Sequence, residues 1–364
     1  MRRGIIAAAT AGLLAVTAVA GCGSSNNSAS PKSNATTTIA GAAAQPFVGV
    51  ILPDTKSSAR YETQDLPNLT AAFKAAGVKY TIQNAQGDTN QFQTIADSML
   101  NQGVNVLIID SLDSASGTAV INKARQAGVP VIDYDRLTVG GGADYYVSFN
   151  NVTVGKLQGR GLVNGLKAKG KFGSHPVVAQ LNGGITDNNA KLFKQGYDSI
   201  LNPLFNAGTF KKATAGDQWT DWDPIKGRTI FDQMLARNGN KIDAVLAAND
   251  GLAGAVIASE KAHGVGPVPL TGQDATPTGV QFILAGWQTG TVYKSVRAEA
   301  AAAARAAINI LKHKPVKTNA KVSGTKSILL TPVWINKNNY KLLFREGFLK
   351  RSQVCVGSYA QYCH

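Results

Sequence analysis

Short apolar runs alternate along the chain with longer amphipathic segments. Phe47–Leu52 is the first apolar run, and Pro53-Asp54 ends it. The stretch that follows, residues 61–76, places its apolar side chains on one helical face and stops at Gly77. A strand followed by a helix is therefore the first predicted unit.

The same alternation recurs through the rest of the chain. Further apolar runs, rich in Val and Ile, predict strands over residues 78–83, 104–109, 129–134, 145–149, 176–181, the segment ending at Trp219, 244–248, 268–271, 291–293 and 328–335. Helical periodicity separates most of them, as in residues 89–101 behind the capping residue Asp88 and in the alanine-rich residues 296–311. Uninterrupted apolar strands are typical of parallel sheets buried on both faces. The predicted fold class is α/β, with a doubly wound, Rossmann-like pattern that occurs twice.

Length and composition agree with two lobes. The chain has 364 residues, about twice the ~100–200 of one domain. Lys and Arg number 37 against 22 Asp and Glu, which gives a net charge of +15. Because the basic residues are spread thinly, a solvated basic surface is favoured over a nucleic-acid site, and we expect no nucleic-acid partner.

The N-terminus has the pattern of an export signal. Residues 1–21 contain no acid, open with Met1-Arg2-Arg3 and continue with a short apolar stretch. The tetrad Val19-Ala20-Gly21-Cys22 resembles the bacterial lipobox, so Cys22 is the predicted lipidation site. Residues 22–45, rich in Gly, Ser, Asn, Ala and Thr, then form the predicted tether. The alternative is a secreted protein that is cut after a small residue and carries Cys22 by chance.

Three cysteines are too few for a disulfide scaffold or a Cys-rich zinc module. Export favours a disulfide between Cys355 and Cys363 over two free thiols.

Polar residues gather where the predicted strands end. They are Asp54, Asp110, Asp135-Arg136, Asn150, Asp187-Asn188-Asn189, Trp219, Asn249-Asp250, Asp274 and Lys294. Any one of the acids can simply cap the next helix. Together, at the carboxyl ends of two facing sheets, they would line one cleft, because ligands of open parallel sheets bind there.

This set of side chains suits a neutral polyol. Carboxylates accept from sugar hydroxyls, amides donate and accept, and an aromatic ring covers the C–H face of the sugar. No Gly-rich loop opens a helix after a strand, which argues against phosphate. The four His have no partner at ligand spacing, so we expect neither metal nor cofactor.

Six ordered blocks carry a family resemblance. They are residues 187–193 (DNNAKLF), 216–219 (GDQW), 240–245 leading to Asn249-Asp250, 272–275 (GQDA), 289–294 (TGTVYK), and 330–332 with 336–339. With these blocks the chain resembles the D-xylose-binding proteins of bacterial ABC transporters, which are type I periplasmic binding proteins. The similarity runs from Phe47 to about Leu349.

The resemblance implies a sugar site. Its ligand contacts match Arg60, Tyr61, Arg136, Asp187, Asn189, Trp219, Asn249, Asp274 and Lys294. Trp219 is the expected stacking ring, and Trp222 and Trp287 are expected to be structural. The family has Trp where this chain has Tyr61, and the loop from Asp54 to Arg60 is one residue longer.

The resemblance also implies an architecture and partners. Residues 46–150 plus 295–325 would form the N-terminal lobe, and residues 151–294 plus 326–364 the C-terminal lobe, joined by three crossings. A monosaccharide, D-xylose by expectation, would bind between the lobes and pass to an ABC transporter permease with its ATPase. The protein would be a monomer that a lipid holds on the outer face of the cytoplasmic membrane.

Other functions stay open at this point. Another pentose or hexose, such as ribose or glucose, could be the ligand, and the protein could feed a sugar sensor. A glycosidase would need two carboxylates about 5–10 Å apart as acid and base. Because each Asp matches a hydrogen-bonding family contact, we expect a binding protein and not an enzyme.

Overall fold

The computed structural model describes residues 45–363. The predicted signal peptide, Cys22 and the tether lie outside the described residues. In the described part the order of elements alternates between strand and helix, as the apolar pattern predicts. Among these residues, no helix combines the length and apolar character needed to cross a bilayer.

The first half of the fold is built on a seven-stranded sheet. Its strand order is β11-β12-β5-β4-β3-β1-β2, and all neighbours are parallel except the β11–β12 pair. The strands are β1 (Phe47–Leu52), β2 (Lys79–Asn84), β3 (Val106–Ile109), β4 (Val131–Tyr134), β5 (Tyr145–Phe149), β11 (Ala320–Val322) and β12 (Thr325–Leu330).

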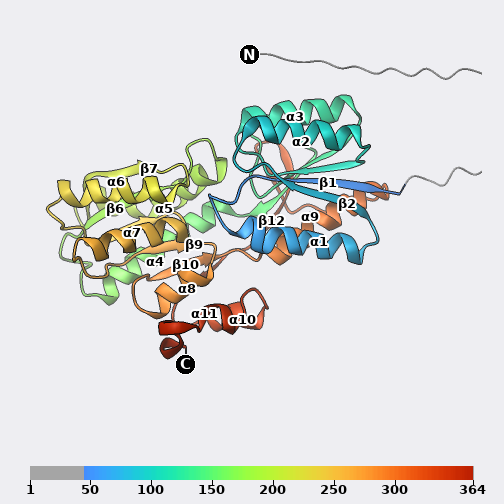
Figure 1. Ribbon diagram of the computed structural model, residues 1–364. Coiled ribbons are helices and arrows are strands. Elements are labelled where there is room, and N and C mark those ends of the chain that lie inside the picture. The colour runs from blue at the N-terminus through green and yellow to red at the C-terminus, as the bar shows by residue number, and fades with distance from the viewer. Residues whose placement is uncertain (1–44, 364) are drawn as a thin grey trace, which may run out of the picture. The chain divides into compact units, whose positions relative to one another are not determined.

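Helices cover both faces of this sheet (Figure 1). On one face α1 (Leu66–Ala75), which follows the π-helical turn η1 (Tyr61–Asp65), packs beside α9 (Val296–Leu311). On the other face lie α2 (Thr89–Asn101), capped by Asp88 as predicted, and α3 (Ser114–Gln126).

The second half contains two three-stranded sheets. One has the order β7-β6-β8, and the other has the order β13-β10-β9. Their strands are β6 (Val177–Asn182), β7 (Lys211–Trp219), β8 (Ala244–Ala247), β9 (Thr271–Gln273), β10 (Gly290–Tyr293) and β13 (Val333–Ile335). A single bridge between Val245 and Leu270 connects the two sheets.

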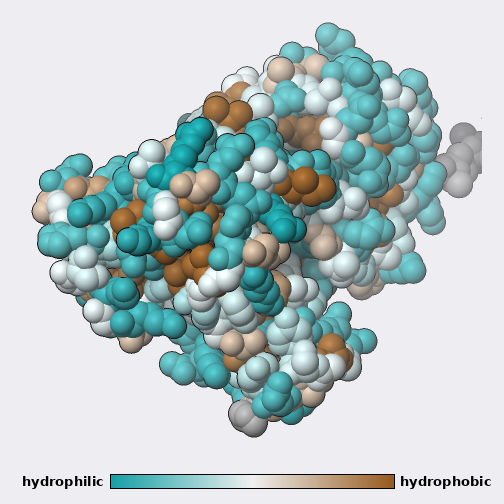
Figure 2. Space-filling model, turned by 60° about the vertical axis from the view of Figure 1, so that its left-hand side comes forward, coloured by the Kyte–Doolittle hydropathy of each residue, from teal (hydrophilic) through white to brown (hydrophobic). Residues whose placement is uncertain are grey.

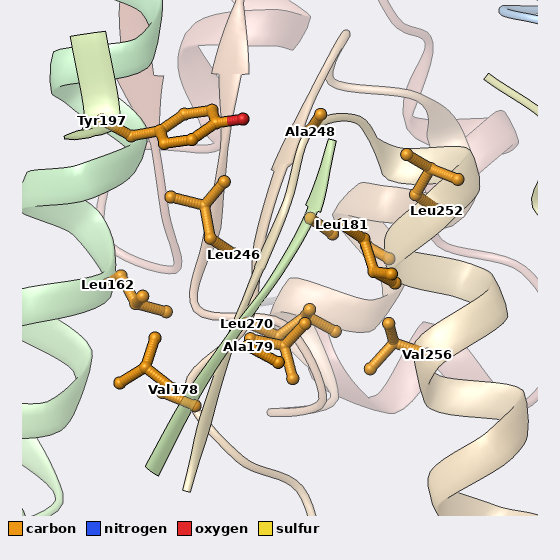
Figure 3. Packing of buried hydrophobic residues seen from close by; sticks show 14 of the residues in the cluster. Leu162, Val178, Ala179, Leu181, Tyr197, Leu246, Ala248, Leu252, Val256 and Leu270 are labelled. Atoms are coloured by element: carbon orange, nitrogen blue, oxygen red, sulfur yellow. The ribbon is translucent and has the colours of Figure 1, made fainter. Parts of the chain in front are cut away.

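Five helices surround these sheets. They are α4 (Asn151–Ala168), α5 (Asn188–Asn206), α6 (Pro224–Arg237), α7 (Asp250–Ala262) and α8 (Pro277–Leu284). Figure 3 shows Leu162 of α4 and Val256 of α7 packing from opposite sides onto a layer of side chains that includes Val178 and Leu181 of β6.

Two strand predictions differ from the structure, and proline explains both. The predicted strand 268–271 begins only at Thr271, because Pro267 and Pro269 have no N–H to donate. The predicted strand 328–335 is two strands separated by Pro332: β12 pairs with β5, whereas β13 pairs with β10. Residues 326–330 therefore belong to the seven-stranded sheet, and not with residues 151–294 as we expected.

The chain passes between the two halves in three places. These lie between β5 and α4, between β10 and α9, and between β12 and β13. The last passage leads to the C-terminal α10 (Lys341–Arg345) and α11 (Arg351–Val354). A disulfide joins Cys355 to Cys363, and Cys363 is buried in a cluster with Val280 and Leu284 of α8.

Glycines allow α4 and α5 to pack backbone against backbone. A Cβ atom on Gly155 would stand 1.9 Å from the carbonyl oxygen of Phe193, and one on Gly196 would stand 2.2 Å from that of Val152. Such distances leave no room for a side chain. This close approach sets the position of α5, whose first turns carry Asn189 and Phe193.

We expect Gly155→Ala to separate α4 from α5 and to lower the free energy of unfolding by about 1–3 kcal/mol or more, because the neighbouring backbone cannot yield easily. Urea unfolding followed by circular dichroism measures this. Gly173→Ala is the matched control, since a Cβ there meets no atom within 4 Å. Equal stability of the two variants would contradict the packing argument.

Candidate functional site

A polar cavity lies where the carboxyl ends of the strands of the two halves meet. Both halves supply its lining, which is Ser57, Ser58, Arg60, Tyr61, Asp135, Arg136, Asp187, Asn189, Phe193, Trp222, Asn249, Gln273, Asp274 and Lys294. Every predicted ligand residue except Trp219 is in this set.

The aromatic wall on the side of the second half is Trp222, and not Trp219. Trp219 ends β7, opposite Asn182, and packs half-buried against the core of its own half. After β7 the chain turns sharply, with left-handed φ values of 55° at Asp221 and 58° at Trp222. The turn folds the ring of Trp222 back into the cleft, where it is only 7% exposed.

Trp222 is held in place by specific contacts. Its Nε1 donates to Oδ2 of Asp187 at 3.0 Å, and its ring meets that of Phe193 edge to face. A Cβ on Gly183 would come within 2.2 Å of the ring, so the Gly183-Gly184 pair leaves the space that the indole fills. That pair reads as an ordinary turn in the sequence, which gives no signal that the ring of Trp222 packs against it.

Asp135 is the central acid on the side of the first half. Its Oδ1 lies 3.3 Å from both Nη1 of Arg60 and Nζ of Lys294, and its Oδ2 accepts from the hydroxyl of Tyr61 at 2.9 Å. Burial by itself would raise the pKa of Asp135, but Lys294, Arg60 and Arg136 outweigh burial and hold that pKa well below its usual range. Asp135 is therefore a carboxylate, and its neighbours are fixed around it.

Arg60 is largely committed to protein partners. Its Nε and Nη2 donate to the two oxygens of Asp65 at 2.9 and 2.7 Å, and Nη2 also meets Glu299 of α9 at 2.6 Å. Only Nη1, beside Asp135, faces the rest of the site. The guanidinium thus positions Asp135 and Tyr61 as well as lining the cavity.

Arg136 has N–H groups that are not committed to protein partners. Its Nη2 donates to the hydroxyl of Ser57 at 3.1 Å, whereas its Nε stands 3.6 Å from carboxylate oxygens of both Asp110 and Asp187. Burial raises the pKa of Asp187 and of Asp110 in spite of this guanidinium. Because 3.6 Å is too long for a hydrogen bond, Arg136 can turn its donors to a ligand hydroxyl.

The loop between β1 and Tyr61 closes over the cavity and reaches the second half. Asn249 donates from Nδ2 to the carbonyl oxygen of Ser57 at 2.9 Å, and Ser58 donates to Asp274 at 2.9 Å. At the rim, Lys56 forms an ion pair of 2.7 Å with Asp223. The sequence shows this loop only as one residue longer than its family counterpart, so Ser57 and Ser58 were not predicted.

A second bridge crosses the deeper part of the cleft. Asn189 of α5 donates from Nδ2 to the carbonyl oxygen of Asp135 at 2.8 Å and accepts from Tyr146 at its Oδ1 at 3.2 Å. The two halves are thus closed upon each other. A ligand here would be enclosed on all sides by hydrogen-bonding groups and covered by two aromatic residues.

The arrangement suits recognition of hydroxyl groups. Ionised Asp135 and the carboxylates Asp187 and Asp274 accept, while Arg136 and Lys294 donate. The charges are paired within the protein, which favours a neutral ligand. Within residues 45–363, no three His, Cys, Asp or Glu side chains are arranged to hold a metal ion.

Comparison with known proteins gives consistent similarities. Residues 48–315 match the family model described as a periplasmic binding protein domain. The chain is 34% identical over 325 residues to the D-xylose-binding periplasmic protein of Escherichia coli, covering 87% of this chain and 95% of that one. It is 35% identical over 335 residues to the multiple sugar-binding periplasmic receptor of Rhizobium radiobacter, with coverages of 86% and 93%.

Solved structures show the same fold. An ABC transporter solute-binding protein from Clostridium phytofermentans with bound β-D-glucose has a TM-score of 0.79 and 28% identity, covering 85% of this chain and 99% of its own. A carbohydrate transporter solute-binding protein from Chloroflexus aurantiacus in complex with D-glucose has a TM-score of 0.76 and 28% identity, with coverages of 84% and 97%.

We expect Trp222→Ala to weaken sugar binding by about 1–3 kcal/mol, from the ring area that a ligand would cover, and to remove most of the sugar-induced change in tryptophan fluorescence. Trp219→Ala is the matched control and should change affinity little. Calorimetric titration of both variants with one sugar measures this. A larger loss of affinity in Trp219→Ala would identify Trp219, at the end of β7, as the stacking ring.

Proposed function

This chain belongs to the periplasmic binding proteins, as a sugar-binding protein of ABC transport and not an enzyme, and we propose that it captures D-xylose in its interlobe cavity. The observation that carries the proposal is the closed cavity itself. Charge-paired hydrogen-bonding groups from both halves surround it, and Tyr61 and Trp222 cover it.

Binding and release would follow from motion of the two lobes. Two hydrogen bonds across the cleft would hold the closed form together: the one between Ser58 and Asp274, and the one between Asn249 and the carbonyl of Ser57. Three chain passages would serve as the hinge. The closed form would then deliver its sugar to the permease, with the ATPase supplying the energy for transport.

The ligand contacts that we propose follow the geometry. Arg136, Asp187, Asn249, Asp274 and Lys294 would hydrogen-bond to hydroxyl groups. Asp135 joins them as an acceptor, with Arg60 and Asn189 holding it in place, and Tyr61 and Trp222 lie against the ring.

The choice of sugar rests on Tyr61 and on the relatives. Two relatives are named for D-xylose, while others are named for several sugars and two solved neighbours hold glucose. The phenol of Tyr61 donates to Asp135, which fixes the ring beside the ligand. Tyrosine is smaller than the tryptophan of the family, so room for the sixth carbon of a hexose is the alternative that the sugar titration tests.

The protein should bind D-xylose more tightly than D-glucose or D-ribose. Xylose and glucose differ by one hydroxymethyl group, and a pocket distinguishes such a group by about 1–3 kcal/mol unless buried polar partners are left unpaired. Calorimetric titration against the three sugars measures the order. Tighter binding of glucose would make glucose, and not xylose, the proposed ligand. The variant Tyr61→Trp would then test whether the smaller ring is the cause. The absence of heat with every pentose and hexose would overturn the sugar proposal.

We further propose that the protein is a monomer held on the outer face of the cytoplasmic membrane by acylated Cys22. The lipobox-like tetrad and the polar segment that follows it support this proposal. Delivery to a sugar sensor fits the same site and location, and it is the alternative to transport.

Metabolic labelling with a fatty-acid probe should mark the wild-type protein and leave Cys22→Ala unmarked, because the thiol of Cys22 is the acceptor. Ser24→Ala is a control that keeps the thiol. Equal labelling of wild type and Cys22→Ala, or none in either, would contradict the lipid anchor.

A further inference from the structure

A segment without acidic residues follows the second passage of the chain between the halves, the one between β10 and α9. No Asp or Glu occurs between Glu299 and Glu346. Seven exposed lysines lie within this stretch, and we call the five that lie from the end of α9 to the start of β12 the basal lysines: Lys312, Lys314, Lys317, Lys321 and Lys326. The sugar site uses none of them.

The basal lysines lack compensating charge. None forms an ion pair with a carboxylate of residues 45–363, whereas lysines elsewhere, such as Lys123 and Lys194, do. Lys321 of β11 stands directly opposite Lys326 of β12 in the antiparallel register. Like charges in such a pair repel each other. A counter-anion brought by a partner would relieve the repulsion.

The topology gathers these lysines at one end of the molecule. The first turn of α9 is at the cavity, where Glu299 meets Arg60 at 2.6 Å. Because α9 has 16 residues, its far end, followed by Lys312, lies about 24 Å away from the cavity. The β11–β12 turn lies at the same end, since β12 runs parallel to β5 and starts there.

This end is also where the chain enters the fold. β1 begins at Phe47 beside Lys79, at the amino edge of the same parallel sheet. The proposed anchor, Cys22, precedes Gln45 by 45 − 22 = 23 residues. An anchored protein would therefore keep this edge close to the lipid headgroups.

We propose that the basal lysines form a docking surface for anionic phospholipid headgroups. The surface would rest on the membrane between transport events, with the sugar cavity at the opposite edge of the sheet. The binding is electrostatic and reversible, because the lysines are exposed, whereas the branched aliphatic side chains among them, Val316 and Val322, are half-buried. On the face that Figure 2 presents, hydrophobic residues form groups among hydrophilic ones. This inference rests on the proposed anchor only for the orientation, and not for the attraction itself.

The lysines have a competing explanation. Lysine on an edge strand such as β11 prevents pairing with another sheet edge. That role would involve Lys321, but Lys312, Lys314 and Lys317 precede the strand and do not lie on the edge. The two explanations predict different consequences of charge reversal. A lipid-docking surface predicts loss of vesicle binding, whereas edge protection predicts self-association.

The test uses the full chain carrying Cys22→Ala, so that acylation plays no part. Sedimentation with vesicles of phosphatidylcholine alone and of phosphatidylcholine with phosphatidylglycerol gives the difference in partitioning that anionic lipid causes. Any contribution of the N-terminal segment is common to all variants. Because each lysine near an anionic surface contributes several-fold to partitioning, Lys312→Glu, Lys314→Glu and Lys317→Glu together should lower the preference for anionic vesicles at least about tenfold. Replacing the same three with Arg should preserve it, and the preference should decline as salt rises.

A second triple variant is the matched control. Lys167, Lys169 and Lys241 are exposed and lie at the amino edge of the β7-β6-β8 sheet, at the end of the other half that points away from the cavity. Changing them to Glu alters the net charge equally and should leave vesicle preference within about threefold, since a flat surface cannot touch both ends of the molecule. Sugar titration verifies that each variant is folded.

Any of three other outcomes would overturn the proposal. Equal losses in the two triple variants would show attraction by net charge alone. Equal partitioning of the parent protein on both kinds of vesicle would show no lipid preference. Self-association of the basal variant with unchanged vesicle binding would assign the lysines to edge protection. Failure of fatty-acid labelling, in contrast, would contradict the lipid anchor and would not affect the conclusion from vesicle binding.

Discussion

The ionised carboxylate of Asp135 is the constraint on which the site depends. Arg60 and Lys294 are buried beside it, and a buried cation without a partner costs several kcal/mol. The side chain of Asp135, which directly follows β4, holds Arg60 and Tyr61 at the start of η1 and Lys294 of the β10–α9 passage. Its backbone carbonyl accepts from Asn189 across the cleft. One residue thus links hinge, cavity and the opposing half.

Charge pairing around Asp135 also limits the ligand. Arg60 is neutralised by Asp65 and Glu299, Lys294 by Asp135, and Arg136 stands among several carboxylates. A charged ligand would disturb this balance inside a closed, poorly solvated space. A neutral molecule with many hydroxyl groups leaves it intact and uses the donors and acceptors that the ion pairs have left over. This balance of charge is the physical reason that a site built from ion pairs would suit a sugar.

Closure and specificity come from different parts of the molecule. The parallel strands supply most of the polar groups at their carboxyl ends, where two sheets face each other. The β1–η1 loop adds Ser57 and Ser58, which bind the opposite half and cover the cavity. The strands determine what is recognised, and the loop keeps the two halves together once the ligand is inside.

The sequence by itself determined the alternation of strands and helices and most of the polar residues that line the cavity. Both follow from local rules: apolar periodicity marks the elements, and polar residues after buried strands share one edge of a sheet. Helices α2 and α9 even have the predicted bounds.

Only the tertiary structure decided which strand belongs to which sheet and which ring enters the cleft. The split of residues 328–335 into β12 and β13 depends on partners far away in the chain, β5 and β10. Trp222 replaces Trp219 because two successive left-handed residues reverse its direction, and because Gly183 leaves space for its ring. Neither the reversal nor the space is visible in the spacing of residues, since both arise from backbone segments that meet only when the chain is folded.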